Sequence, residues 1–257
     1  MLDKLRLEID SFDAVLTETL YRRFAAAARV AAYKKERGLA VYQPEREAAV
    51  LNKIAGIMKN KSFGVEIQEL YRHIFQLSRR VQIHQVFPYN MVFIGFMGSG
   101  KSTIGRYLAE ISGYNYYDVD TMIEQQAGQS VQEIFSIHGE KHFRSLEREV
   151  VERLRTVDHA VIACGGGVVL DAANVSHLKE KGKFIWLKAA PETVYERLKH
   201  QNNRPLIKDK NFDDIKNLLK SREGLYGAVA DYEVATDGKL ISDIGHDIMN
   251  MITNTAK

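Results

Sequence analysis

The sequence predicts a multidomain protein, with an N-terminal all-α domain of three helices followed by a C-terminal α/β domain that contains a parallel sheet. Up to about residue 86, apolar residues recur at helical spacing and no run resembles a strand. From residue 91 onward, short apolar runs alternate with helical stretches, which is typical of a parallel sheet covered by helices on both faces. We therefore expect domains at 1–86 and 91–257, joined by a linker at 87–90 that contains Pro88.

The first predicted helix is unusually long. Its apolar residues recur every three or four positions for about 35 residues and end near Arg37 and Gly38, where glycine favours a helix end. A second helix begins at Pro44, and a third carries apolar residues from Ile67 to Val81. A domain of this size cannot easily bury all these apolar faces alone, so we expect a homodimer through the helices.

The second domain begins with a phosphate-binding loop (P-loop). Five strands are expected there, at 91–94, 114–117, 160–164, 183–187 and 232–236. Directly after the first, Gly95–Ser102 match G-x-x-x-x-G-K-S, and a helical pattern follows. The glycines at 95, 98 and 100 allow backbone angles closed to other residues, so that the loop's N–H groups can converge on an anion. Lys101 is expected to reach the outer phosphates and the Ser102 hydroxyl to join the shell of Mg²⁺. The alternative, a glycine-rich turn that binds nothing, is disfavoured by the flanking strand and helix.

Composition excludes several classes of protein. Of the 257 residues, 45% are hydrophobic and 27% charged, which is ordinary for a soluble globular protein. The net charge of +3 is too small to indicate a nucleic-acid partner. The single cysteine, Cys164, cannot form an internal disulfide and suits a reducing compartment. The charged N-terminus does not resemble a signal peptide, and no apolar run reaches the roughly 20 residues of a membrane span. We therefore expect a cytoplasmic protein with no membrane partner.

Charged residues follow the predicted strands of the second domain. Asp118 and Asp120 are expected at the end of one strand, where alternate residues share a face and where open α/β sheets bind ligands. One carboxylate could serve Mg²⁺ and the other could accept a proton from a substrate hydroxyl. The alternative is a pair of solvated turn residues, which is less expected beside a phosphate-binding loop.

Further polar residues lie downstream in the same domain. Arg144 and Glu147 are three apart on a predicted helix, so they can face one way, although a surface ion pair of little consequence is the alternative. The run Gly165–Gly167 favours close approach of the backbone to a ligand, and Cys164 before it is expected to be a buried small residue. Arg204 lies in a polar stretch suited to a lid over the phosphate, and Arg222 offers another cation. Each arginine taken alone could be a solvated surface residue.

Taken together, these stretches resemble shikimate kinase over about residues 91–250. The resemblance implies phosphorylation of shikimate by ATP, with Mg²⁺ as the cofactor. One departure is Gly224, where the family usually has proline. The implied catalytic residues are Lys101, Asp120 and Arg204. The implied ATP-binding residues are Gly98, Ser99, Gly100, Lys101, Ser102, Thr103, Arg197, Arg204 and, more weakly, Lys239, with Ser102 and Asp118 at the metal. The implied shikimate-binding residues are Asp120, Arg144, Glu147, Gly165, Gly166, Gly167 and Arg222.

The N-terminal helices carry polar residues at spacings that place them together. Arg23 and Lys34 are 11 residues apart, or about three turns, so they share a face, whereas Arg6 is turned by about 100° and could serve a different pocket. Ser78 and Gln82 are four apart on the third helix and face together. The alternative is that all are solvated positions on a dimeric bundle.

This pattern looks like the all-helical AroQ class of chorismate mutase, over about residues 1–86. The resemblance implies an intertwined dimer that rearranges chorismate to prephenate without any cofactor. Arg6 and Arg23 would bind the two carboxylates, Lys34 and Gln82 would act catalytically on the ether oxygen, and Glu47 would accept from the ring hydroxyl. Gln43 stands where many members have aspartate. The implied chorismate-binding residues are Arg6, from the other protomer, and Arg23, Lys34, Gln43, Glu47, Ser78 and Gln82.

Two alternative functions remain open at this point. The helices could form a dimerisation or regulatory module without catalytic activity, attached to a shikimate kinase. The second domain could instead phosphorylate another small polyol or a nucleotide. The charged residues of the first domain argue against the former, and Asp120, Arg144 and Arg222 argue against the latter.

Overall fold

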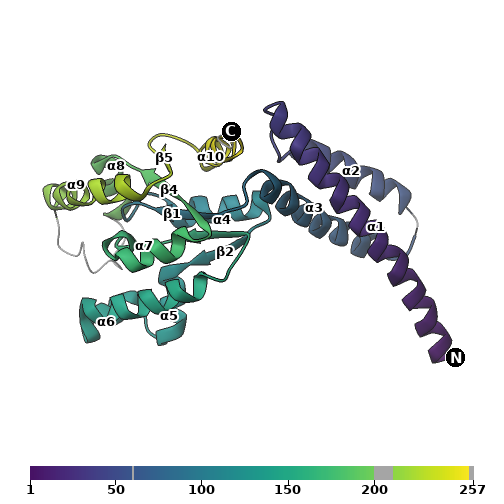
Figure 1. Ribbon diagram of the computed structural model, residues 1–257, viewed down its shortest axis with the longest axis horizontal. Helices are drawn as coiled ribbons and strands as arrows, with labels where there is room; N and C mark the ends of the chain where they lie inside the picture. The colour runs from purple at the N-terminus through teal and green to yellow at the C-terminus, as the bar shows by residue number, and fades with distance from the viewer. Residues whose placement is uncertain (60, 200–210, 255–257) are drawn as a thin grey trace. The chain divides into compact units, whose positions relative to one another are not determined.

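The computed structural model describes residues 1–59, 61–199 and 211–254 (Figure 1). The chain divides into two compact units, of which the first consists mainly of Met1–Pro88 and the second mainly of the residues that follow. Each unit is described by itself.

The first unit is helical, as expected. Its described elements are α1 (Leu2–Glu36), α2 (Pro44–Ile57) and α3 (Gly64–Val86). The long first helix is confirmed: it ends at the Arg37 cap, after which Gly38 takes a positive φ of 63° that redirects the chain. Helix α2 begins at Pro44 as predicted, and both α1 and α2 pack against α3.

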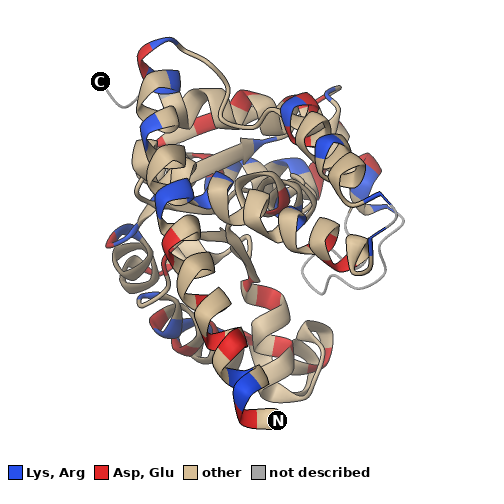
Figure 2. Ribbon diagram, turned by 90° about the vertical axis from the view of Figure 1, so that its right-hand side faces the viewer, with Lys and Arg blue, Asp and Glu red and all other residues tan. Residues whose placement is uncertain are grey.

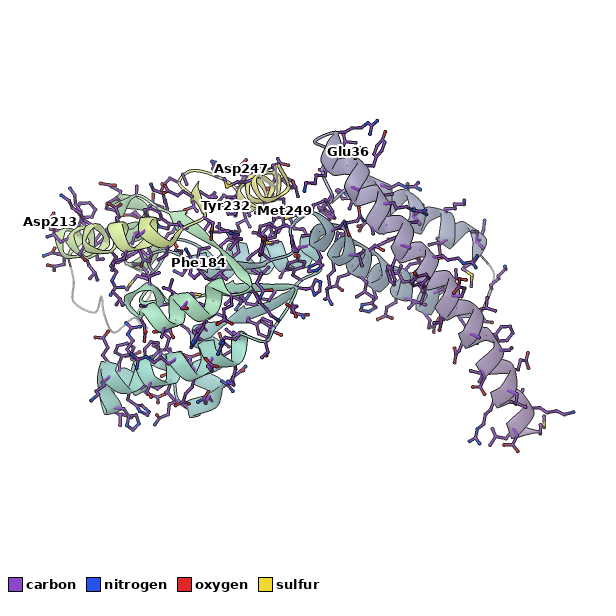
Figure 3. The ribbon with its side chains drawn as sticks, viewed as in Figure 1. Glu36, Phe184, Asp213, Tyr232, Asp247 and Met249 are labelled. Carbon is purple, nitrogen blue, oxygen red and sulfur yellow. The ribbon has the colours of Figure 1, made fainter. Side chains whose placement is uncertain are left out.

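The N-terminal half of α1 projects beyond α2 and α3, and its side chains stand clear of these two helices (Figure 3). Large apolar residues on it are exposed, among them Leu5 at 50% and Phe12 at 63%. Leu2, Leu7, Ile9, Val15 and Leu16 are exposed as well. Such a concentration of exposed apolar side chains on one helix is characteristic of an interaction surface.

The second unit alternates strands and helices. Its strands are β1 (Asn90–Ile94), β2 (Asn115–Asp118), β3 (Ala160–Ala163), β4 (Gly182–Lys188) and β5 (Tyr232–Ala235). Its helices are α4 (Lys101–Ser112), α5 (Val119–Ala127), α6 (Val131–Leu154), the 3₁₀ turn η1 (Val168–Leu170), α7 (Ala172–Lys179), α8 (Pro191–Leu198), α9 (Phe212–Val229) and α10 (Ile241–Asn254). Each predicted strand is found within one residue of its expected bounds. Helix α6 is broken at Gly139, whose φ of 77° lies outside the helical range.

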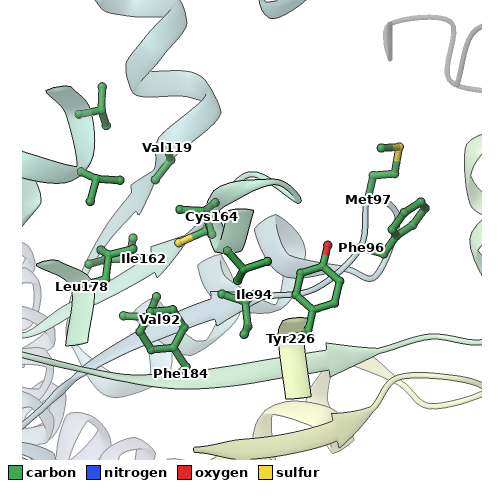
Figure 4. Close-up of a cluster of buried hydrophobic side chains, with 14 of the residues drawn as sticks. Val92, Ile94, Phe96, Met97, Val119, Ile162, Cys164, Leu178, Phe184 and Tyr226 are labelled. Atoms are coloured by element: carbon green, nitrogen blue, oxygen red, sulfur yellow. The ribbon is translucent and has the colours of Figure 1, made fainter. Parts of the chain in front are cut away.

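Within the described residues, the strands form one parallel sheet in the order β2-β3-β1-β4-β5. Val92 of β1 pairs with Ile162 of β3 and with Phe184 of β4, and Figure 4 shows these three side chains gathered on one face. The same apolar cluster includes residues from α5 to α9. Met91 and Val161, which alternate to the other face, are also fully buried, and Gly105 of α4 lies over Val161. Helices therefore cover both faces, as the sequence predicts.

One detail of the predicted sheet is wrong. Asp118 is the last residue of β2, but its carboxylate accepts from the backbone N–H of Thr121 and so caps helix α5. Asp120 consequently lies in the first turn of α5 and not on a strand. The two carboxylates therefore do not share a face as alternate residues of one strand.

Charges of both signs alternate along the described helices. Figure 2 shows lysine and arginine interspersed with aspartate and glutamate along the helices. Among the described helices, none combines the length and the apolar character that crossing a bilayer requires.

Candidate functional sites

The P-loop connects β1 to α4 with the backbone conformation that the motif requires. Gly95, Gly98 and Gly100 have φ values of 136°, 77° and 97°, which only glycine adopts easily. A side chain at position 95 would also lie 2.5 Å from the carbonyl oxygen of Leu187. The Lys101 side chain is buried, and its Nζ donates to the carbonyl oxygens of Gly95 and Phe96, both at 2.8 Å. The lysine is thus kept at the loop that it is expected to serve.

The expected metal ligands lie side by side. The hydroxyl of Ser102, in the first turn of α4, donates to Oδ2 of Asp118 at 2.8 Å. The hydroxyl of Tyr116 donates to the same oxygen at 2.9 Å, and burial followed by the charge of Asp118 raises the pKa of Tyr116. A hydroxyl and a carboxylate beside a P-loop are hard oxygen ligands of the kind that Mg²⁺ prefers, so the donor set fits this ion. Sequence analysis missed Tyr116, although its position two residues before Asp118 in a strand places it on the same face.

A hollow opens next to the P-loop, at the ends of β1 and β3. It is lined by all the residues that the sequence resemblance assigns to shikimate, together with apolar residues from the P-loop and α6 that it did not assign. The former are Asp120, Arg144, Glu147, Gly165, Gly166, Gly167 and Arg222, and the latter are Met97, Val131, Phe135 and Phe143.

The glycine run makes room for charged side chains. A Cβ on Gly165 would lie 2.8 Å from Oδ1 of Asp120, and a Cβ on Gly167 would lie 2.4 Å from Nη2 of Arg144. Close approach was expected from the sequence, and here the approaching groups are these two side chains. Cys164, just before the run, is buried, and burial raises its thiol pKa, so it is not a nucleophile.

Arg144 is positioned by carboxylates on its own helix. It donates to Glu147 and to Glu140, each at 2.9 Å, which confirms that Arg144 and Glu147 face together. Burial raises the pKa of Glu147, whose side chain is fully enclosed, and its Oε1 has no hydrogen-bond partner among the described atoms. Burial lowers the pKa of Arg144, but the carboxylates of Glu147 and Glu140 have the larger combined effect, so the pKa is raised. The guanidinium therefore stays charged at the edge of the hollow.

Arg222 enters the hollow from α9. Its Nη1 donates to the carbonyl oxygen of Gly166 at 3.3 Å. Tyr226, one turn later on the same helix, donates to that oxygen at 2.6 Å and is almost fully buried. Figure 4 shows its hydroxyl pointing away from the strands. Tyr226 was not predicted, but its spacing of four from Arg222 is the signal that could have found it.

The residues expected to bind the nucleotide differ in whether they contact the P-loop. Arg197 on α8 donates to the carbonyl oxygen of Gly98 at 2.9 Å and approaches Thr236, so it bridges the P-loop and the end of β5. Lys239 pairs with Asp247 at 2.7 Å. Ser99 is fully buried, whereas Thr103 is exposed. Arg204 lies outside the described residues.

A second hollow lies among the helices of the first unit. It is lined by six of the seven residues that were expected to bind chorismate, namely Arg23, Lys34, Gln43, Glu47, Ser78 and Gln82. Arg46 of α2, which sequence analysis had not assigned to the site, lines it as well. Arg6 does not line it: its side chain is 67% exposed and lies 3.7 Å from Asp3.

The cations of this hollow are partly desolvated. Nη1 of Arg23 donates to Oγ of Ser78, and Nζ of Lys34 donates to the carbonyl oxygen of Val41 at 2.8 Å. Burial lowers the pKa of both Arg23 and Lys34, and the charge of Glu47 opposes this at each. Cations kept from water without a matching number of anions favour an anionic ligand.

The amide of Gln82 is also incompletely satisfied. Its nitrogen donates to the Ser78 carbonyl oxygen at 3.3 Å, but its buried oxygen has no hydrogen-bond partner among the described atoms. A buried polar atom of this kind costs free energy unless a ligand or water completes it.

Comparison with known proteins assigns a family to each part of the chain. The family model for shikimate kinase matches residues 97–253, and the model for chorismate mutase type II matches residues 5–83. The chain belongs to the shikimate kinase family. It also carries an N-terminal chorismate mutase domain, and the two together make it a bifunctional enzyme of aromatic biosynthesis.

Curated relatives match the kinase domain over nearly their whole length. The shikimate kinase of Moorella thermoacetica is 46% identical over 161 residues, which is 63% of this chain and 92% of that protein. The shikimate kinase of Persephonella marina is 42% identical over 163 residues, or 63% and 98%. The solved structure of shikimate kinase from Acinetobacter baumannii in complex with shikimate has a TM-score of 0.63 at 35% identity, and the match covers 66% of this chain and 96% of that one.

Proposed function

We propose that the kinase domain, residues 91–257, transfers the γ-phosphoryl group of MgATP to a ring hydroxyl of shikimate, and that residues 1–86 rearrange chorismate to prephenate as part of a homodimer. Residues 87–90 link the two domains. Neither reaction needs a covalent bond to the protein, so each domain acts by positioning and by charge. The single cysteine further supports a cytoplasmic location.

The observation that carries the kinase proposal is that two arginines and the carboxylate of Asp120 line the same hollow beside the P-loop. Arg144 and Arg222 suit the carboxylate of a small substrate, since a guanidinium can bind it with two parallel hydrogen bonds. Asp120, in the same hollow, then accepts the proton of the attacking hydroxyl. An uncharged polyol or a nucleoside would bring no anion to these two guanidinium groups.

At the phosphate end, Lys101 and the backbone N–H groups of the P-loop bind the phosphates of ATP. Ser102 and Asp118 would hold Mg²⁺, which neutralises charge on the phosphates when it is bound. Arg197 contacts the P-loop at the carbonyl oxygen of Gly98 and would stack on the adenine of the nucleotide.

A substrate panel tests the kinase proposal. The purified full chain is given MgATP with shikimate, with quinate, with gluconate or with a nucleoside, and release of ADP is measured. The proposal is supported if shikimate is the one member of the panel that is phosphorylated, at a kcat/KM of roughly 10⁴ M⁻¹s⁻¹ or more. Faster turnover with a substrate that lacks a carboxylate would contradict it.

The mutase proposal is supported by the hollow of the first unit, which is lined by more cationic than anionic side chains. Arg23 binds one carboxylate of chorismate and fixes the reactive conformer, while Lys34 and Gln82 donate to the ether oxygen as it gains negative charge. Glu47 accepts from the ring hydroxyl. Loss of chorismate absorbance in the presence of the full chain is the direct assay, and a rate no higher than the uncatalysed one would favour the alternative of a non-catalytic helical module.

The second carboxylate of chorismate requires a further cation, and we assign it to Arg6 of a second copy of the chain. The exposed apolar side chains on the N-terminal half of α1 support this, because burying them against another copy would bring Arg6 with them. Gln43 brings no charge to the hollow, and its amide can still accept a hydrogen bond.

Mixed dimers test the contribution of Arg6 in trans. Arg6→Ala and Lys34→Ala chains are each expected to lack mutase turnover. When equal amounts are unfolded together and refolded, half of the dimers pair unlike chains and have one intact pocket of two, so about a quarter of the normal rate should return. Recovery of no activity would contradict an Arg6 that acts across the dimer.

A further inference from the structure

The mutase hollow has a carboxylate whose surroundings the proposed reaction does not explain. Glu47 opens α2, and Nη1 of Arg79 on α3 donates to its Oε1 at 2.7 Å and to its Oε2 at 2.6 Å. The exposed fractions of the two side chains are only 12% for Arg79 and 25% for Glu47. The Arg79 guanidinium also lies over the ring of Tyr42, at 5.2 Å from its centroid.

Arg79 stands behind Glu47 and not in the hollow. It directly follows Ser78 on α3, so it is turned by about 100° from the face that Ser78 and Gln82 present to the hollow. Glu47 itself lines the hollow, whereas Arg79 is not among the lining residues. The arginine therefore contacts the lining of the hollow through the carboxylate of Glu47.

The charges around Glu47 give this contact a consequence. Among the described residues that line the hollow, Glu47 is the one carboxylate, and Arg23, Lys34 and Arg46 are the cations. The charge of Glu47 acts on both Arg23 and Lys34. A glutamate side chain free to rotate would be drawn to these cations and would neutralise the groups that must bind the substrate carboxylates.

We infer that Arg79 is a positioning residue of the mutase site, which keeps the Glu47 carboxylate turned away from Arg23 and Lys34 so that both remain available to a dianionic substrate. This inference rests on the proposed mutase function. Arg79 would affect the binding of chorismate through Glu47. It would not affect the groups that donate to the ether oxygen.

Steady-state kinetics on the full-length chain test the inference. Arg79→Met is expected to raise the KM for chorismate about tenfold and to change kcat by less than about threefold, since binding and not the catalytic groups is affected. Arg79→Lys, which keeps one charged donor, should recover most of the affinity. Arg72→Met is the matched control: Arg72 lies two turns earlier on the same helix and is exposed, so its removal should leave both constants unchanged.

A double variant decides whether Arg79 acts through Glu47. If it does, Arg79→Met combined with Glu47→Gln should bind chorismate no more weakly than Glu47→Gln alone, because no carboxylate is left to position. Additive losses would overturn the inference, as would an Arg79→Met KM within twofold of the original. A loss of helix content in Arg79→Met that the double variant does not restore would also overturn it, since the arginine would then serve the fold.

These outcomes are separable from failure of the proposed function. If the original chain does not consume chorismate, the mutase proposal itself fails. If the original chain turns chorismate over and the Arg79 variants behave like it, only the inference about Arg79 fails.

Discussion

The two hollows of this protein use arginine for the same purpose but support it differently. In the kinase hollow, Arg144 lies between two carboxylates of its own helix, and Arg222 donates to the backbone of Gly166. In the mutase hollow, Arg23 and Lys34 donate to a neutral hydroxyl and to a carbonyl oxygen, and burial lowers the pKa of both. Arg144 is therefore held by charged partners, whereas Arg23 and Lys34 of the mutase hollow donate to neutral oxygens.

The difference follows from where each site obtains its residues. The kinase hollow draws all its expected shikimate-binding residues from one compact unit. The mutase hollow contains every expected residue except Arg6, which lies on the exposed half of α1. The proposed dimer would let a helical domain with little core of its own complete its binding site with a second copy, whereas a sheet with a large core can complete a site alone.

The largest expected effect tests whether the two sites are independent. Lys34→Ala should lower the mutase kcat by about 10² to 10³, because a donor to the developing charge is lost. Kinase turnover should stay within about twofold, since no kinase residue is altered. Lys35→Ala is the control, because Lys35 is the exposed neighbour on the same helix. Loss of kinase turnover in Lys34→Ala would show that the comparison of two separate sites is wrong.

Arg144→Ala should weaken shikimate binding far more than ATP binding. The arginine lies at the substrate hollow and away from the P-loop contacts of Lys101, so we expect the KM for shikimate to rise about 10² and the KM for ATP to change by less than about threefold. Arg148→Ala, four residues later on the same helix and paired with Asp171, serves as the control. Equal losses for the two substrates would remove the assignment of this hollow to shikimate.

The sequence was sufficient to predict the elements and most of the polar residues that line the two hollows, but not the contacts between those residues. Helical and strand periodicity located α1 and β1 because burial has a fixed period in each. Asp120 was misplaced because the capping bond from Asp118 to Thr121, which starts a helix at that point, competes with the strand pattern. Arg79 and Tyr116 were missed because each acts through another side chain, and contacts of that kind depend on tertiary packing.

Tyr116→Phe should have a smaller effect, confined to the metal. Its hydroxyl donates to the Asp118 oxygen that Ser102 also contacts, so its loss leaves the orientation of the carboxylate less defined. Removing such a contact behind a ligand should weaken Mn²⁺ binding, measured by electron paramagnetic resonance with ADP present, by about tenfold. Tyr117→Phe is the control, because that ring packs against the core. Unchanged Mn²⁺ affinity in Tyr116→Phe would show that Ser102 and the Thr121 N–H orient Asp118 without the tyrosine.

The smallest expected effect concerns the buried carboxylate of the kinase hollow. Burial raises the pKa of Glu147 in the folded chain above its ordinary value of 4.5, so the folded state binds this proton more tightly than the unfolded state. The stabilising effect of that proton is complete below the ordinary pKa and is lost as the pH rises through the folded-state value. Glu147→Gln cannot ionise and retains a hydrogen-bond acceptor for Arg144. The Tm of the variant should therefore rise relative to that of the original chain between about pH 4 and pH 7. The expected change is about 2–4 °C for each kcal/mol of unfolding free energy that the original chain loses. If the Tm of the original chain instead rose relative to that of the variant over this range, the charge of Arg144 would outweigh burial at Glu147.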